Sequence, residues 1–227
     1  MTFWNADTAY AVGLITTDGN LSKDKRHISL TSADIQLLQA FRKCLSINNK
    51  ICVNPPGSYS KNVCYKITFG NIRFYNWLLK IGLRTNKTFD LSSLDIPDKY
   101  FCDFLRGHVD GDGSIIHYID RHNSYKDKLY VYDRIYIAFR SGSLLHIKWI
   151  QRSIKRFLNI YGSLSAWKNK KRADSKSIWV LRFCKKESLT LLKYLYYKPH
   201  LPCLLRKKKI AESFLKKTSP SPETIVF

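Results

Sequence analysis

Acidic residues are scarce in this sequence. Its 227 residues include 39 Lys and Arg but only 17 Asp and Glu, so the net charge is +22. The positive charge is spread along the whole length, and no basic amphipathic helix stands apart as it would in a membrane-surface protein. The imbalance therefore predicts a polyanion as partner, with nucleic acid favoured over an acidic membrane surface.

Long apolar runs and paired cysteines are also missing. No run approaches the roughly 20 residues of a membrane span, and the N-terminal segment has no basic region and carries Asp7. The six cysteines contain no CxxC pair and no close His/Cys cluster with the spacing of zinc ligands. We therefore expect an intracellular protein that is neither secreted nor membrane-bound, in a prokaryotic cytoplasm or an organelle matrix.

Two of the few acidic residues lie at the same place in two similar short patterns, just before a final glycine. Residues 11–19 read AVGLITTDG and residues 105–113 read LRGHVDGDG. Gly13 matches Gly107, and Asp18 matches Asp112, at one constant offset of 94 residues. The repeat indicates a duplicated unit with one acid in each copy.

Small residues recur four positions apart in both patterns, a spacing that lines one face of a helix. They are Ala9, Gly13 and Thr17 in the first pattern and Gly107 and Gly111 in the second. Two such helices are predicted to pack closely, which brings the two acids side by side.

The segments that follow the two patterns correspond as well. Hydrophobic spacing predicts the order helix, two strands, helix, two strands, helix in each copy. The predicted fold class is α+β with two αββαββα halves. The predicted boundaries are an N-terminal half at 1–84, a linker at 85–98, a C-terminal half at 99–217 and a flexible tail at 218–227.

These motifs and this order resemble the single-chain, two-motif LAGLIDADG homing endonucleases over nearly the whole chain. The resemblance implies two pseudo-symmetric halves whose antiparallel sheets form a DNA-binding saddle. It also implies a monomeric, intron-encoded enzyme that cuts both strands of a long, non-palindromic duplex across the minor groove and leaves short 3′ overhangs. The first motif departs from the pattern at Thr16, which replaces the acid that Asp110 retains in the second.

Asp18 and Asp112 are the predicted catalytic and metal-binding acids. At two adjacent helix C-termini, the helix dipoles and the like charge oppose ionisation unless a cation is present. Paired carboxylates beside a phosphate suit Mg²⁺, which activates water and stabilises the leaving oxygen. Mn²⁺ is expected to substitute, and Ca²⁺ to support binding without cleavage. The backbone carbonyls of Thr17 and Gly111 are candidate additional ligands.

The resemblance also implies basic residues near the metal. Lys87 and Lys207 match these catalytic lysines, although Arg206, Lys208 and Lys209 compete with Lys207 for the role. The alternative for each lysine is an ordinary contact with phosphate.

Side chains along the strands are predicted to contact the DNA. They can touch either phosphates or base edges in the major groove. The candidates are Lys23, Lys25, His27, Ser29, Asn54, Lys66 and Thr68 in the first half, and His117, Tyr118, Arg121, Tyr136, Arg140, Trp167, Lys168, Lys170 and Arg182 in the second.

Two alternatives keep this fold but change the role. One is a maturase that binds intron RNA, and the other is a DNA-binding regulator that does not cleave. Retention of both acids favours the enzyme. A regulator is expected to carry an added helix-turn-helix, for which the segment after Lys217 offers no room.

Overall fold

The computed structural model describes residues 3–55, 63–85, 87–125, 128–168 and 177–218, without the side chains of 87–88, 122–130 and 218.

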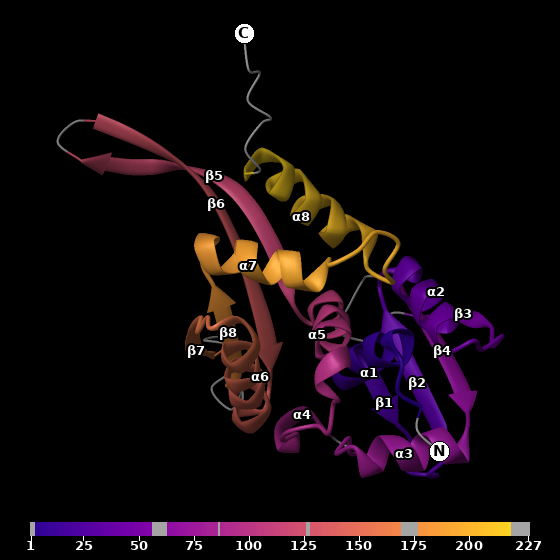
Figure 1. The fold of residues 1–227 in the computed structure, drawn as a ribbon. Coiled ribbons are helices and arrows are strands. Elements are labelled where there is room, and N and C mark those ends of the chain that lie inside the picture. Colours follow the sequence, from indigo (N-terminus) through magenta and orange to yellow (C-terminus); the bar gives the residue numbers. More distant parts are fainter. Residues whose placement is uncertain (1–2, 56–62, 86, 126–127, 169–176, 219–227) are drawn as a thin grey trace, which may run out of the picture.

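The chain builds two successive halves with the same order of elements (Figure 1). The first half consists of α1 (Ala6–Asp18), β1 (Gly19–Leu21), β2 (His27–Ser32), α2 (Ile35–Cys44), β3 (Ile51–Asn54), β4 (Cys64–Gly70) and α3 (Ile72–Lys80). The second half consists of α5 (Phe101–Asp110), β5 (Ser114–Tyr125), β6 (Lys128–Ser141), α6 (Leu144–Leu158), β7 (Ser163–Trp167), β8 (Ile178–Phe183) and α7 (Lys185–Leu195). The helix α8 (Leu205–Thr218) follows. The predicted α+β class with two αββαββα halves is confirmed.

Each half contains one antiparallel sheet of four strands. The strand order is β1-β2-β4-β3 in the first sheet and β5-β6-β8-β7 in the second, so the two sheets have the same topology. Among the described residues, no helix combines the length and the apolar character that a membrane crossing requires.

One face of each sheet is apolar and packs against helices. In the first sheet Ile28 pairs with Phe69, and in the second Ile137 pairs with Phe183; all four side chains are buried. The helices α2 and α3 cover the first sheet, and α6 and α7 cover the second. Because successive residues of a strand point to opposite faces, the polar residues between these positions lie on the outer faces.

The segment between the halves is packed against the second half. It contains the short helix α4 (Lys87–Asp90) and the 3₁₀ turn η1 (Asp98–Tyr100). Leu91 and Leu94 are buried. The Ser143 hydroxyl, which also caps the N-terminus of α6, donates a hydrogen bond to the carbonyl of Leu91.

The hairpin of β5 and β6 is the main difference between the halves. Its strands are far longer than the matching β1 and β2, and they project beyond the helices (Figure 1). The helix α8 lies along the base of this hairpin, where the ring of Phe214 contacts His117 with centroids 5.0 Å apart.

The helices α1 and α5 lie side by side between the two halves (Figure 1). A Cβ atom on Gly13 would lie 2.7 Å from the backbone nitrogen of His108, and one on Gly107 would overlap the carbonyl oxygen of Tyr10. Only hydrogen side chains allow the two backbones to approach this closely. The close helix contact predicted from the glycine spacing is therefore present.

We predict that Gly107→Ala destabilises the protein by about 3 kcal/mol. The added methyl group would clash with backbone atoms of Tyr10, which cannot move aside by a change of side-chain rotamer. Denaturant unfolding of the purified protein measures the change. The matched control is Gly70→Ala, whose methyl group would approach side chains and no backbone, namely Arg26 at 3.0 Å and the His27 ring at 3.3 Å. Equal losses in the two variants would contradict the helix contact.

Candidate active site between the motif helices

The ends of α1 and α5 bring the two motif acids into one region. Asp18 is the last residue of α1, and Asp112 lies two residues beyond the end of α5. A Cβ atom on Gly111 would overlap the Thr17 hydroxyl and lie 2.8 Å from Oδ2 of Asp18. The Asp18 carboxylate is therefore directed at the residue that precedes Asp112.

The donor set at this point suits a hard divalent cation. It consists of two carboxylates with backbone carbonyls nearby, and oxygen ligands of this kind are those that Mg²⁺ prefers. In the parts of the chain that the structure describes, no group of three or more His, Cys, Asp and Glu side chains converges as a metal cluster. The carboxylate and carbonyl oxygens present are donors that fit Mg²⁺ better than zinc or another metal that needs nitrogen and sulfur ligands.

A small cavity lies beside Asp112. Its volume is about 60 Å³, enough for ordered water. The cavity connects the acid to the second sheet and to the buried histidines. Its walls are formed by Thr16, Thr17, Leu91, His108, Asp112, Arg140, Ser141, Gly142 and His146.

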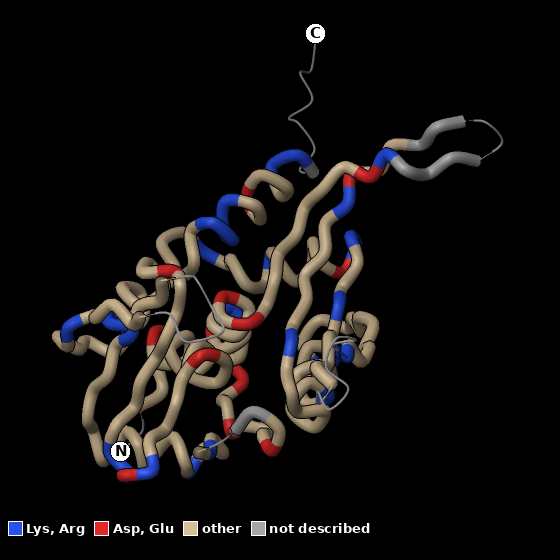
Figure 2. The backbone as a smooth tube through the Cα atoms, turned by 180° about the vertical axis from the view of Figure 1, so that it is seen from behind, with Lys and Arg blue, Asp and Glu red and all other residues tan. Residues whose placement is uncertain are grey.

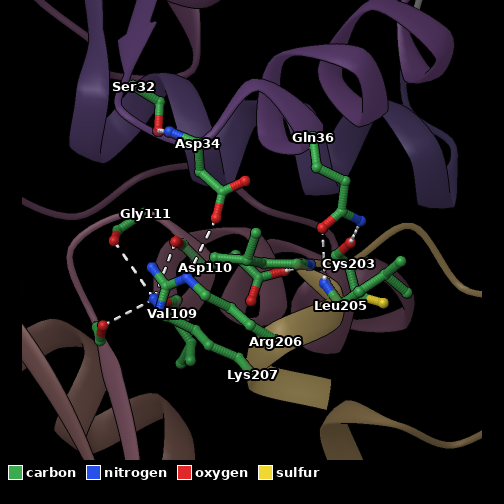
Figure 3. Close-up of polar contacts among 12 residues, drawn as sticks. Ser32, Asp34, Gln36, Val109, Asp110, Gly111, Cys203, Leu205, Arg206 and Lys207 are labelled. Carbon is green, nitrogen blue, oxygen red and sulfur yellow. Dashed lines mark hydrogen bonds and ion pairs between the residues drawn. The ribbon is translucent and has the colours of Figure 1, made fainter. Parts of the chain in front are cut away.

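Lys207 is buried at the C-terminal end of α5, with only 3% of its surface exposed. Its amine donates hydrogen bonds to the carbonyl oxygens of Val109 at 2.5 Å, Asp110 at 2.9 Å and Gly113 at 2.8 Å (Figure 3). The Gly111 oxygen is farther away, at 3.5 Å. Lys207 thus lies at the site, but as a partner of backbone carbonyls and not as a surface lysine. The other predicted lysine, Lys87, opens α4, and its side chain lies outside the described residues.

The charges around Lys207 include both motif acids. Burial lowers its pKa to about 8, whereas the carboxylates of Asp110, Asp18 and Asp112 act in the opposite direction. The neighbouring Asp110 is buried as well, and burial raises its pKa while Lys207 opposes the rise.

The helix α5 has an interior polar face that α1 lacks. The positions that match Val12 and Thr16 of α1 are Arg106 and Asp110, both buried. Asp110 accepts hydrogen bonds from the Tyr10 hydroxyl at 2.9 Å and from the backbone nitrogen of Leu204 at 2.8 Å. The second motif helix is thereby bonded both to α1 and to the segment before α8.

Arg106 extends these bonds along the same face of α5. Its guanidinium donates to the carbonyls of Leu195 at 3.0 Å and Pro202 at 2.8 Å, and to Asp103 at 2.6 Å. The composition of the motif gave no sign of these buried partners of Arg106 and Asp110.

Five predicted DNA contacts share the outer face of the first sheet. The register pairs Ser29 with Thr68 and places Lys66 opposite Cys52, on the side away from the helices. Ser29 is only 5% exposed, so it offers little surface. These five residues are His27, Ser29, Asn54, Lys66 and Thr68. Lys23 and Lys25 are exposed in the turn between β1 and β2.

Five predicted contacts share the outer face of the second sheet. The Arg182 guanidinium lies 4.7 Å from the ring of Tyr136, which meets Tyr118 edge to face at 6.3 Å. Pairing along the strands places Tyr136, Arg140, Trp167 and Arg182 on this face together with Tyr118. Arg121 is exposed at an irregularity in β5, Lys168 is exposed just after β7, and Lys170 lies outside the described residues.

His117 was placed wrongly by the sequence reasoning. It pairs with the buried Ile135, and its ring contacts Phe214 and approaches Asp133 at 2.5 Å on the helix side of the sheet. Adjacent strand residues point in opposite directions, so His117 and Tyr118 never share a face.

Arg134 was missed, although the same alternation would have found it. It pairs with Tyr118, lies 4.9 Å from the Tyr132 ring and forms an ion pair with Asp120 at 2.6 Å.

Figure 2 shows acidic positions gathered near the paired helices, with Lys and Arg positions over the flanking elements and along α8.

Comparison of the structure with solved structures finds close likenesses in fold. The LAGLIDADG homing endonuclease I-LtrWI bound to target DNA gives a TM-score of 0.58 at 15% identity, over 93% of this chain and 90% of that one. The meganuclease I-SmaMI bound to uncleaveable DNA gives 0.55 at 13% identity, over 95% and 91%. This is the LAGLIDADG fold.

The likeness in fold extends to a protein that is not named as an endonuclease. Full-length DUF199/WhiA from Thermatoga maritima gives a TM-score of 0.54 at 16% identity over 97% of this chain, which spans 64% of the length of that protein. No protein-family model and no curated protein sequence matches the chain. The assignment of a reaction therefore depends on the residues of the site.

We predict that Arg106→Leu lowers the free energy of unfolding by about 3–5 kcal/mol, because Asp103 and two carbonyls lose a buried cationic partner. Thermal and denaturant unfolding report the loss. Arg156→Leu is the matched control, since Arg156 also binds an aspartate at 2.6 Å but both partners are 59% exposed. The free energy of unfolding of Arg156→Leu is expected to remain nearly unchanged. A larger effect at Arg156 than at Arg106 would contradict this description of α5.

Proposed function

We propose that the chain is a monomeric, Mg²⁺-dependent endonuclease that cuts both strands of a specific DNA duplex. The observation that supports this most directly is the contact of Gly111 with Asp18 at the ends of the paired helices. This approach supports a site in which the two halves contribute one acid each at adjacent helix ends, so that each acid would serve one strand of the duplex.

Asp18 and Asp112 would hold the cation, with the carbonyls of Thr17 and Gly111 as further oxygen donors. Mg²⁺ bound there supplies an activated water and charge stabilisation at the leaving oxygen. The cavity beside Asp112 gives water a place next to the site, and Arg140 on its wall brings positive charge toward a scissile phosphate.

The two outer sheet faces would bind the duplex. Strands of a sheet can lie in the major groove, where base edges are distinguishable. The first face offers Lys66 and Thr68, whereas the second offers Tyr136 and Arg182 and continues into the long hairpin. Different side chains on the two faces select different half-sites, so the target would be long and non-palindromic.

Non-cleaving DNA binding is the second candidate, because a similar fold occurs in DUF199/WhiA, which is not named as an endonuclease. The presence of an acid at both helix ends favours cleavage over this alternative. Binding of intron RNA by a maturase is a further possible role of the same scaffold, and a cleavage assay separates both from the nuclease.

We predict that the purified protein with Mg²⁺ cuts members of a duplex library at one sequence class. Sequencing of the cut ends is expected to show short 3′ overhangs. Asp18→Asn and Asp112→Asn should each abolish double-strand cleavage while duplex binding in Ca²⁺ persists. The reason is that each acid is expected to bind the metal and not to stabilise the fold.

The control for these variants is Asp95→Asn, which changes an exposed aspartate between the halves. It should cleave as the unchanged protein does. Full Mg²⁺-dependent cleavage by either motif variant would remove the two-acid mechanism, and duplex binding without cleavage by the unchanged protein would favour the regulator.

We predict that Arg182→Met weakens binding to the mapped duplex about 10-fold, because Arg182 lies exposed on the outer face of the second sheet. Fluorescence anisotropy in Ca²⁺ measures this affinity. Lys186→Met removes an equal charge from α7, on the helix side, and is expected to have a much smaller effect. The reverse ranking would place the duplex on the helices.

A further inference from the structure

The amine of Lys207 has no proton left for a water or a phosphate. An ammonium group carries three protons, and three carbonyl oxygens accept from Lys207 at 2.5–2.9 Å. A lysine that polarises an attacking water needs at least one of these protons free. The observed geometry therefore indicates another role for this residue.

The three carbonyls lie on both sides of Asp112. Those of Val109 and Asp110 belong to the last turn of α5, and that of Gly113 follows the acid directly. A cation at a helix C-terminus satisfies carbonyls that have no partner within the helix. In this position the amine also joins the two backbone segments that carry Asp112, and so limits the positions that its carboxylate can adopt.

Asp110 supplies the balancing charge in the buried interior. It is 1% exposed, and its Oδ2 atom accepts from the Tyr10 hydroxyl and the Leu204 nitrogen. The ammonium and this carboxylate attract each other. Tyr10 belongs to α1, so the first half helps to hold this arrangement.

The segment that carries Lys207 is fixed to the first half by a second set of bonds (Figure 3). The Gln36 side chain of α2 donates to the Cys203 carbonyl at 3.2 Å and accepts from the Leu205 nitrogen at 3.0 Å. Arg206 binds Asp34 at 3.1 Å. The lysine therefore reaches Asp112 from a backbone anchored on α2.

The first motif has no equivalent of the buried carboxylate. The residue that matches Asp110 is Thr16, whose hydroxyl donates to the Val12 carbonyl of its own helix at 2.7 Å. Among the described residues, a lysine with a buried carboxylate beside it is therefore found next to the second acid and not next to the first.

We propose that Lys207 and Asp110 are positioning residues that fix the Gly111–Gly113 turn, so that Asp112 is held ready for the divalent cation. Lys207 does not polarise the attacking water. This inference rests on the proposed nuclease function, which makes Asp112 a metal ligand. Groups that orient a ligand typically contribute 10- to 100-fold to metal affinity.

The test compares Lys207→Met with Lys209→Met, a change to an exposed lysine on the same helix. Mn²⁺ binding to the purified protein is followed by electron paramagnetic resonance. We expect the Kd for Mn²⁺ to rise about 10- to 100-fold in Lys207→Met and to stay unchanged in Lys209→Met. Single-turnover cleavage by Lys207→Met should recover as the Mg²⁺ concentration is raised.

Tyr10→Phe provides a milder test in case Lys207→Met fails to fold. It removes only the hydroxyl that bonds to Asp110, and the Kd for Mn²⁺ is expected to rise about 3- to 10-fold. An unchanged Kd for Mn²⁺ in the folded variants would overturn the positioning role. A lower cleavage rate that Mg²⁺ does not restore would assign Lys207 to the water instead. Absence of Mn²⁺ binding in the unchanged protein would overturn the proposed metal-dependent function itself.

Discussion

The approach of α1 to α5 at Gly13 and Gly107 is the constraint on which the other features depend. Each glycine lies against the backbone of the opposite helix, so there is no side chain through which the distance could be adjusted. The same contact sets where Asp18 meets Gly111, and it fixes the position of one sheet relative to the other. A small separation of the helices would move both acids and both outer faces together, so in the proposed nuclease the geometry of the cut would depend on the geometry of binding.

The two copies of the motif use this contact differently. At Val12 and Thr16 the helix α1 is apolar or bonded within its own helix, whereas at the matching positions α5 buries Arg106 and Asp110. Buried charges are costly unless they are paired and hydrogen-bonded. Here their partners come from α1 and from residues 195–207, and the bonds hold a segment of irregular backbone against the helix pair.

The offset of 94 residues was sufficient to predict the paired helices and the common order of elements, because glycine spacing and hydrophobic period are local properties of the sequence. Side-chain direction in the strands was predictable in principle, and the error at His117 came from naming it together with its neighbour Tyr118. The bonds of Lys207 were not predictable. Its partners are backbone carbonyls, which any sequence possesses, and only the tertiary path of residues 201–207 brings them within reach.

A duplicated unit in one chain can assign different physical tasks to its two copies. Asp18 is the last residue of a regular helix, whereas Asp112 lies in a turn beyond α5 whose position, in our proposal, depends on support from outside that helix. Lys207 supplies this support from a segment bonded to α2. A symmetric dimer would have to repeat one solution in both subunits. A single chain can instead use the first half to hold the acid of the second, while its two sheets develop different outer faces.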